Sequence, residues 1–231
     1  DWLEKNGEKD NWMMHVHYWD PHTPYRTPAG YEDHFSDTPL PDDWITEEIF
    51  QEHLLHIGPH GANEINMWND DSFAQWPKHP GKLETLQDAK RFLNQYDEGI
   101  RYTDDNIGMI VGWLKDHGLY GDDLAIIITA DHGEDLGEFG VYAEHGMADE
   151  PVCRIPLIIK WPGMQKGTVA KGFHDNTDLT PTVQELLQTP MFMGDRYHYD
   201  GTSFAETLRN GKDCSKPYAV LTQCAHVCQR S

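Results

Sequence analysis

A carboxylate and an imidazole stand side by side directly after an apolar run. Asp131 and His132 follow residues 124–128, which read Leu-Ala-Ile-Ile-Ile. A short, Ile-rich run between polar residues is typical of a strand buried on both faces, and such sheets bind ligands just past the carboxyl ends of their strands. Because the chain turns there, both side chains can reach one cation. The pair therefore predicts a divalent-metal site, and a solvated turn is the alternative interpretation.

A second candidate lies in a loop that prolines hold on both sides. His22 follows residues 11–19, a predicted strand, and stands between Pro21 and Pro24. The prolines end the strand and fix the backbone of the loop, so the imidazole is held in a preset position. His22 is therefore a candidate functional residue, and a loop histidine bonded only to backbone is the alternative.

Other segments predict the elements that position these side chains. The apolar residues of 86–115 recur at steps of three and four, which indicates a long helix with one apolar stripe. Residues 154–163 predict a second buried strand and turn, and residues 218–222 predict a further strand. Thr180 and Pro181 suit the N-cap and the first position of a late helix.

Composition excludes several classes of function. The chain has 231 residues with 38% hydrophobic and 25% charged side chains, as expected of a globular domain. Lys and Arg number 18 against 39 Asp and Glu, a net charge of −21, which argues against nucleic acid as a partner. No apolar run approaches the ~18–20 residues of a membrane helix, so we expect no membrane partner. An enzyme of anionic esters with this charge would depend on a local cation.

The order of three motifs resembles the sulfatase family. T-A-D-H-G-E-x-L-G-E, then E-H-G, then R-I-P-L-I-I-K-W-P-G resemble the C-terminal part of the catalytic domain of sulfatases, within the alkaline phosphatase superfamily. The resemblance extends over roughly residues 11–209. It implies an α/β fold in which helices sandwich a mixed, largely parallel sheet, truncated at both ends. Residues 1–213 would be a partial catalytic domain, and residues 214–231 the beginning of a small C-terminal subdomain.

The resemblance also implies a chemistry, the hydrolysis of a sulfate ester. Asp131 and His132 would bind the metal, which the family suggests is Ca²⁺, although an imidazole ligand also suits Mn²⁺ or Zn²⁺. His22 matches a P-H-x-P-Y element and would face the leaving-group oxygen. Sulfatases often carry a lysine close to the place of Glu144 and His145, and a protonated His145 can bind a sulfate oxygen in its stead. The implied partner is a sulfated small molecule or glycan.

The family's nucleophile, a formylglycine made from Cys or Ser in C/S-x-P-x-R, is not found. Cys153 and Cys214 each have a proline one place too late and lack the arginine. We therefore expect the nucleophile on a missing N-terminal segment of the same protein. Two alternatives stay open. Asp-His in place of Asp-Asn favours a phosphonate or phosphate ester hydrolase of the same superfamily, and the missing nucleophile favours a non-catalytic, glycan-binding fragment.

Overall fold

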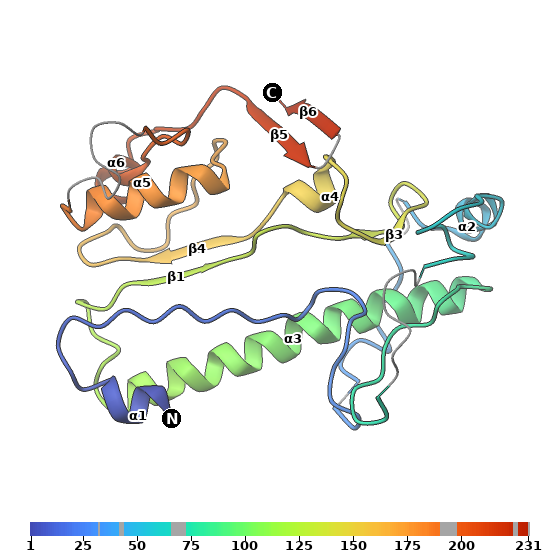
Figure 1. The fold of residues 1–231 in the computed structure, drawn as a ribbon, viewed down its shortest axis with the longest axis horizontal. Coiled ribbons are helices and arrows are strands. Elements are labelled where there is room, and N and C mark those ends of the chain that lie inside the picture. Colours follow the sequence, from blue (N-terminus) through green and yellow to red (C-terminus); the bar gives the residue numbers. More distant parts are fainter. Residues whose placement is uncertain (32, 42–43, 66–72, 190–197, 224–225, 231) are drawn as a thin grey trace. The chain divides into compact units, whose positions relative to one another are not determined.

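A computed structural model describes residues 1–31, 33–41, 44–65, 73–189, 198–223 and 226–230. The protein contains both helices and strands (Figure 1). It forms two compact units. Unit 1 comprises residues 1–120 and 133–145, and unit 2 comprises residues 121–132 and 146–231. The chain thus leaves unit 2 after His132 and enters unit 1 at Gly133. The boundary expected between residues 213 and 214 stays a prediction.

Unit 1 is organised around one long helix. Its elements are α1 (Trp2–Asn6), α2 (Glu47–His53), α3 (Leu86–Asp116), β2 (Asp135–Leu136) and β3 (Tyr142–Glu144). The helix predicted over residues 86–115 is confirmed as α3, which begins with a capping box between Thr85 and Asp88. It ends at His117, and Gly118 follows with φ +70°, as expected of a glycine that terminates a helix. Strands β2 and β3 pair antiparallel.

A cluster of aromatic rings forms the core of unit 1. Tyr25, Phe92 and Tyr142 are buried, with ring centroids 5.2 Å apart for Tyr25 and Phe92 and 5.7 Å apart for Phe92 and Tyr142. Buried aromatic pairs contribute large apolar areas and prefer this edge-on geometry. Because Phe92 belongs to α3, the helix anchors both the loop that follows His22 and strand β3, which leads to His145.

The segment before His22 is not the strand that its sequence predicts. Residues 11–19 lie in no ladder among the described residues. The segment runs beside α3 (Figure 1), and at its end the hydroxyl of Thr103 donates to the carbonyl of Asp20 at 3.1 Å. Met13 and Trp19 are 84% and 66% exposed. The predicted strand is therefore wrong, because an alternating pattern does not specify a neighbouring strand.

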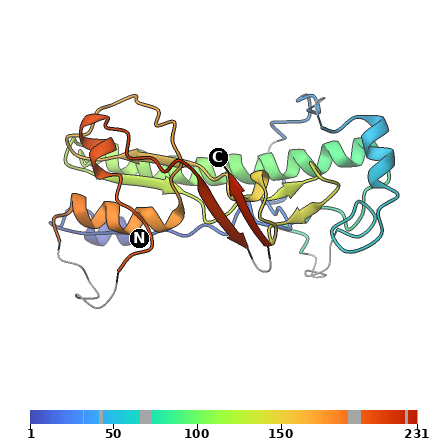
Figure 2. The same cartoon turned by 90° about the horizontal axis from the view of Figure 1, so that it is seen from above.

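Unit 2 contains two pairs of strands and three helices in its described part. They are β1 (Ile126–Thr129), α4 (Glu150–Cys153), β4 (Leu157–Lys160), α5 (Asn176–Leu186), α6 (Ala205–Asn210), β5 (Ala219–Gln223) and β6 (His226–Arg230). The strands predicted within residues 124–128, 154–163 and 218–222 are confirmed as β1, β4 and β5. Strand β1 pairs with β4, and β5 with β6, both antiparallel (Figure 2).

The predicted sheet differs from the observed ladders in direction and in burial. Every ladder of strands in the described ranges is antiparallel, so the largely parallel sheet is not found there. Strands β1 and β4 were both expected to be buried, but the residues of β1 are half-buried or exposed, and Leu157 and Ile158 of β4 are 41% and 61% exposed. An apolar run predicts a strand that can be covered on both faces, but it does not encode which strand pairs with it or what covers it. Among the helices of the described residues, none combines the length and apolar character needed to span a bilayer.

Helix α5 begins five residues earlier than Thr180 and Pro181 indicated. Asp175 is the N-cap: its carboxylate accepts the N–H of Thr177 at 2.9 Å, and Asp178 accepts the N–H of Asp175 at 3.0 Å. This reciprocal capping box satisfies two helix-end donors, and Asp is among the preferred N-cap residues. Pro181 lies inside the helix. The stronger cap therefore overrides the Thr-Pro signal.

A buried carboxylate in unit 2 depends on one lysine. Asp178 is 1% exposed, and Lys216 pairs with it at 2.8 Å and also with Asp175. We expect Lys216→Met to lower the free energy of unfolding by about 2 kcal/mol, less than the roughly 3–5 kcal/mol of fully buried pairs, because Lys216 is partly exposed. Urea denaturation at pH 7 measures this change. Lys166→Met is the matched control, because its pair with Asp122 is almost fully exposed and is worth little.

The pH dependence of the same variant tests the role of Asp175. Burial raises the pKa of Asp175, but hydrogen bonds from Lys216 and Thr177 outweigh it and hold the pKa below its ordinary value. A lowered carboxyl pKa stabilises the fold above the unfolded-state pKa of about 3.9, and the contribution is lost as the pH falls through the folded-state pKa. The difference between the wild type and Lys216→Met should therefore shrink below about pH 4. A difference that grows in acid would contradict this assignment.

Candidate functional site

The loop predicted to position His22 is a tight turn in unit 1. The N–H of His22 donates to the carbonyl of Trp19 at 3.0 Å, and the N–H of Tyr25 donates to the carbonyl of His22 at 3.1 Å. The Nδ1 atom of His22 lies 2.6 Å from the carbonyl oxygen of Thr23. Because a carbonyl only accepts, Nδ1 carries the hydrogen of this contact.

Two of the predicted site histidines lie together. The ring centroids of His22 and His145 are 4.7 Å apart, and Trp19 lies 4.5 Å from His22. Both histidines are half-buried. Residues 22 and 145 are separated by most of the chain of unit 1, and the aromatic core brings their segments to one place. The structure thus pairs these two imidazoles, and their catalytic roles stay predictions.

One buried carboxylate connects both histidine segments. Glu134 accepts the N–H of Thr23 through Oε1 and the hydroxyl of Tyr25 through Oε2, each at 3.2 Å. Its Oε1 atom also lies 3.5 Å from Nδ1 of His145, and the Glu134 side chain is only 3% exposed. Burial, followed by the negative charge of Glu134, raises the pKa of Tyr25 well above its ordinary value and that of Tyr96 to about 12. The phenol of Tyr25 therefore remains a donor to Glu134 at neutral pH.

Asp131 and His132 lie at the end of β1 in unit 2. Oδ1 of Asp131 accepts the N–H of His132 at 3.1 Å, and Oδ2 lies 3.9 Å from Nε2 of His132. The side chain of Asn176 donates to the carbonyl oxygen of Asp131 at 2.9 Å, which ties the turn to the start of α5. The Asp131 side chain is 79% exposed, and that of His132 is 23% exposed. The two potential ligands are therefore adjacent, as the sequence predicted, and metal binding by them stays a prediction.

The donor set of this pair fits a cation only in part. Asp131 offers at most two oxygens and His132 offers one nitrogen, whereas calcium takes ~6–8 oxygen ligands. The imidazole suits manganese or zinc better than calcium. A cation held here would need further ligands.

Sequence reasoning did not identify Glu134 or Asn176. A signal for Glu134 was present, because it follows His132 by two residues within D-H-G-E. Its burial and its contacts with residues 23 and 25 depend on the tertiary fold. Asn176 carried no signal, because it is the first residue of a helix whose start was placed later.

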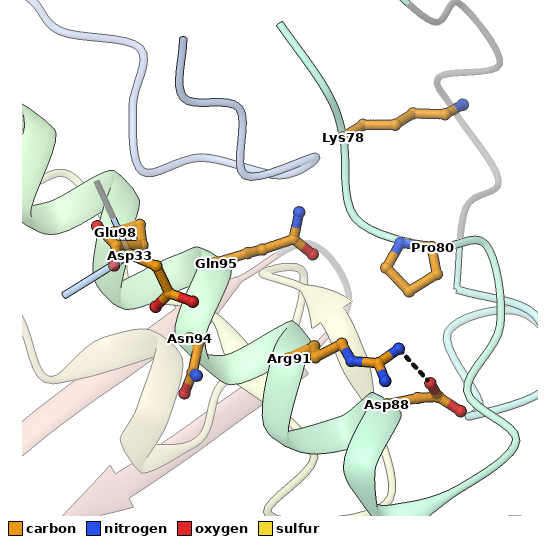
Figure 3. A pocket seen from close by; sticks show the side chains of 8 residues that line it. All are labelled: Asp33, Lys78, Pro80, Asp88, Arg91, Asn94, Gln95 and Glu98. Atoms are coloured by element: carbon orange, nitrogen blue, oxygen red, sulfur yellow. Dashed lines mark hydrogen bonds and ion pairs between the residues drawn. The ribbon is translucent and has the colours of Figure 1, made fainter. Parts of the chain in front are cut away.

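A separate hollow of about 490 Å³ in unit 1 contains none of the predicted site residues. It is lined by Asp33, Lys78, Pro80, Asp88, Arg91, Asn94, Gln95 and Glu98 (Figure 3). Arg91 points toward Asp88 and pairs with it at 3.3 Å. Glu98 accepts from both the backbone N–H and the ring of His34. Arg91, Asp88 and Glu98 thus have partners within the protein.

Comparisons with known proteins agree with the motifs. A model of the sulfatase family matches residues 1–189. A multifunctional alkaline phosphatase superfamily protein of Trinickia caryophylli is 29% identical over 204 residues, covering 87% of this chain and 38% of that protein. An N-acetylglucosamine-6-sulfatase of Capra hircus is 21% identical over 223 residues, covering 96% of this chain and 36% of that protein. The solved structure of a phosphonate monoester hydrolase from Silicibacter pomeroyi is 28% identical with a TM-score of 0.54, covering 60% of this chain and 26% of that one. The chain spans less than two-fifths of the length of each of these proteins.

Proposed function

Because the chain belongs to the sulfatase family, we propose that it supplies part of the active site of a sulfuric ester hydrolase that acts on a sulfated carbohydrate. Its similarity to an N-acetylglucosamine-6-sulfatase over almost its whole length supports a sulfated sugar as the substrate. The formylglycine nucleophile then comes from residues outside these 231, since C/S-x-P-x-R is absent from them. The mixed, largely parallel sheet typical of the resembled fold is part of the same proposal.

The contacts of Glu134 carry this proposal. Glu134 is bonded to the loop of His22 and lies 3.5 Å from His145. Glu134 therefore connects the two candidate catalytic histidines within unit 1, and Asp131 and His132 directly precede Gly133 and Glu134 in the sequence.

Asp131 and His132 would hold a divalent cation. The cation supplies positive charge that neutralises the developing charge of the transition state and offsets the acidic surface of the protein. Asn176 holds the carbonyl of Asp131 and so fixes the turn from which the carboxylate projects. The mixed oxygen and nitrogen donors support manganese or zinc beside the calcium that the family resemblance suggests.

The two histidines act on the ester itself. His145, backed by the buried carboxylate of Glu134, grips a sulfuryl oxygen through a charge-assisted hydrogen bond. His22 donates its Nδ1 hydrogen to the carbonyl of Thr23, so its Nε2 carries the proton that passes to the departing oxygen. The packing of Trp19 against the His22 ring limits its rotation.

A phosphonate or phosphate ester hydrolase is the second candidate. The Asp131–His132 pair favours it, and so does the 28% identity to a phosphonate monoester hydrolase. Both reactions need a cation, a nucleophile and a proton donor for the leaving group, so the same residues serve either one. The two candidates differ only in the anionic group that His145 and the cation bind.

Paired assays on the full-length protein separate the candidates. We expect kcat/KM for 4-nitrophenyl sulfate to exceed that for 4-nitrophenyl phosphate and for a phenylphosphonate monoester by at least about tenfold, or about 1.4 kcal/mol in transition-state binding. A tenfold preference for either phosphorus ester would support the second candidate instead. Binding of a sulfated oligosaccharide without turnover of any ester would show a non-catalytic glycan-binding protein.

A further inference from the structure

Both ring nitrogens of His60 face oxygen atoms of strand β3. Its Nδ1 atom lies 3.1 Å from the carbonyl oxygen of Tyr142, and its Nε2 atom lies 3.0 Å from Oε2 of Glu144. The side chains of His60 and Glu144 are 12% and 25% exposed. The backbone carbonyl of His60 also accepts the N–H of Tyr142 at 2.7 Å. His60, in the loop after α2, therefore makes three contacts with strand β3.

Both partners of the His60 ring are hydrogen-bond acceptors. A carbonyl oxygen and an ionised carboxylate both accept hydrogen bonds and cannot donate them. A neutral imidazole has one N–H and can satisfy only one of them, whereas the imidazolium satisfies both. The nearby His53 does not compete for these oxygens, because it contacts the hydroxyl of Tyr142 at 2.8 Å and burial lowers its pKa.

Glu144 carries the effect of His60 to the candidate site. Its Oε1 atom accepts the backbone N–H of His145 at 2.8 Å, while Oε2 faces His60. The carboxylate is thus a bridge between His60 and the backbone of a candidate catalytic residue. Ala143 and His60 both have left-handed backbone conformations, with φ of +52° and +61°. Non-glycine residues rarely hold this conformation unless surrounding contacts impose it, and such positions concentrate near functional sites.

We propose that His60 is a positioning residue of the hydrolase site, which in its doubly protonated form holds Glu144 and thereby fixes the backbone of His145. This inference rests on the proposed function for its catalytic consequence. The contacts from His60 to Glu144 and from Glu144 to the backbone of His145, called the brace below, lie within unit 1. They can be tested without turnover. His60 belongs to a histidine-rich stretch that the proposed mechanism otherwise leaves unused.

Matched substitutions in the full-length protein remove one contact at a time. His60→Asn keeps a donor near the place of Nδ1, and His60→Gln keeps one near the place of Nε2. His60→Asn, which loses the contact with Glu144, should lower kcat about tenfold with KM changed less than twofold, because small displacements of a group that contacts the reacting atoms reduce the rate more than the affinity. His60→Gln, which keeps that contact and loses only the one to Tyr142, should lower kcat by only about threefold. Glu144→Gln should lower kcat about as much as His60→Asn. His117→Gln, at the exposed end of α3, is the control and should leave kcat unchanged.

A double-mutant cycle then tests the bridge. The variant with both His60→Asn and Glu144→Gln should lose about tenfold in kcat, because either change alone already breaks the brace. A loss of about 100-fold in kcat of the double variant, the product of the two single losses, would show independent roles and overturn the proposal. So would kcat values of His60→Asn and Glu144→Gln within twofold of the wild type.

Hydrogen exchange at the amide of His145 gives a readout that does not require activity. His60→Asn and Glu144→Gln should each speed this exchange at least about tenfold, and the double variant should add less than twofold. If no ester is hydrolysed but this coupling is observed, the brace stands and the proposed function fails. If the exchange rate is unchanged in all three variants, the brace is overturned whatever the activity.

Discussion

Asp131→Ala in the full-length protein is expected to lower kcat/KM for the sulfate ester by at least about 10³-fold, because a cation's charge stabilisation is worth several kcal/mol and each 1.36 kcal/mol is a factor of ten. The substitution removes the carboxylate oxygens beside His132 and leaves the contact of Asn176 with the backbone carbonyl in place. The turn should therefore keep its shape while it loses affinity for the cation. Elemental analysis of the purified protein should show less than about a tenth of the wild-type metal content, because metal affinity depends on the number and charge of the ligands.

Asp104→Ala is the matched control for this experiment. Asp104 is an exposed acid on α3, so its removal changes the net charge equally without touching the strand end. If Asp131→Ala keeps both its metal and a rate within threefold of the wild type, the cation is bound elsewhere. Loss of rate with full metal content would instead assign Asp131 a role toward the substrate.

The elements that local signals specify were predicted well. Helix α3 has a long apolar stripe, a capping box at Thr85 and a glycine at residue 118, and these agree with one another. Strand β1 was recognisable because its Ile-rich run is bounded by polar residues. The start of α5 shows the limit of such signals. Both Asp175 and the Thr180–Pro181 pair suit a helix start, and the helix begins at Asp175 because its side chain accepts from the backbone donors there.

What depends on partners distant in the sequence could not be predicted in the same way. The apolar residues of β1 and β4 do not indicate that the two strands pair antiparallel. Likewise, the alternating pattern of residues 11–19 does not indicate that this segment pairs with no other strand among the described residues. The residue types of Asp131, His132, His22 and His145 suggested a metal-binding and acid–base chemistry, which stays a prediction. The contribution of Glu134 arises from burial against Thr23 and Tyr25, which lie more than 100 residues away in the chain.

His22→Ala is expected to have an effect that depends on the leaving group. For a carbohydrate sulfate, whose alkoxide is a poor leaving group, kcat should fall about 10²–10³-fold, the range of general acid catalysis. For 4-nitrophenyl sulfate the loss should stay below about tenfold, because a phenolate of low basicity departs with little help from a proton. Steady-state kinetics with both esters, and with phenyl sulfates of graded leaving-group pKa, measure this difference.

His17→Ala separates this role from a general effect of histidine removal, because His17 is an exposed residue of the same N-terminal segment. Its kinetics should match the wild type with every ester. Equal losses for good and poor leaving groups in His22→Ala would show that His22 does not protonate the departing oxygen. His22 would then act on the sulfuryl group beside His145, 4.7 Å away. The leaving-group dependence therefore decides between two positions of the same imidazole relative to the ester, which a loss of activity alone cannot do.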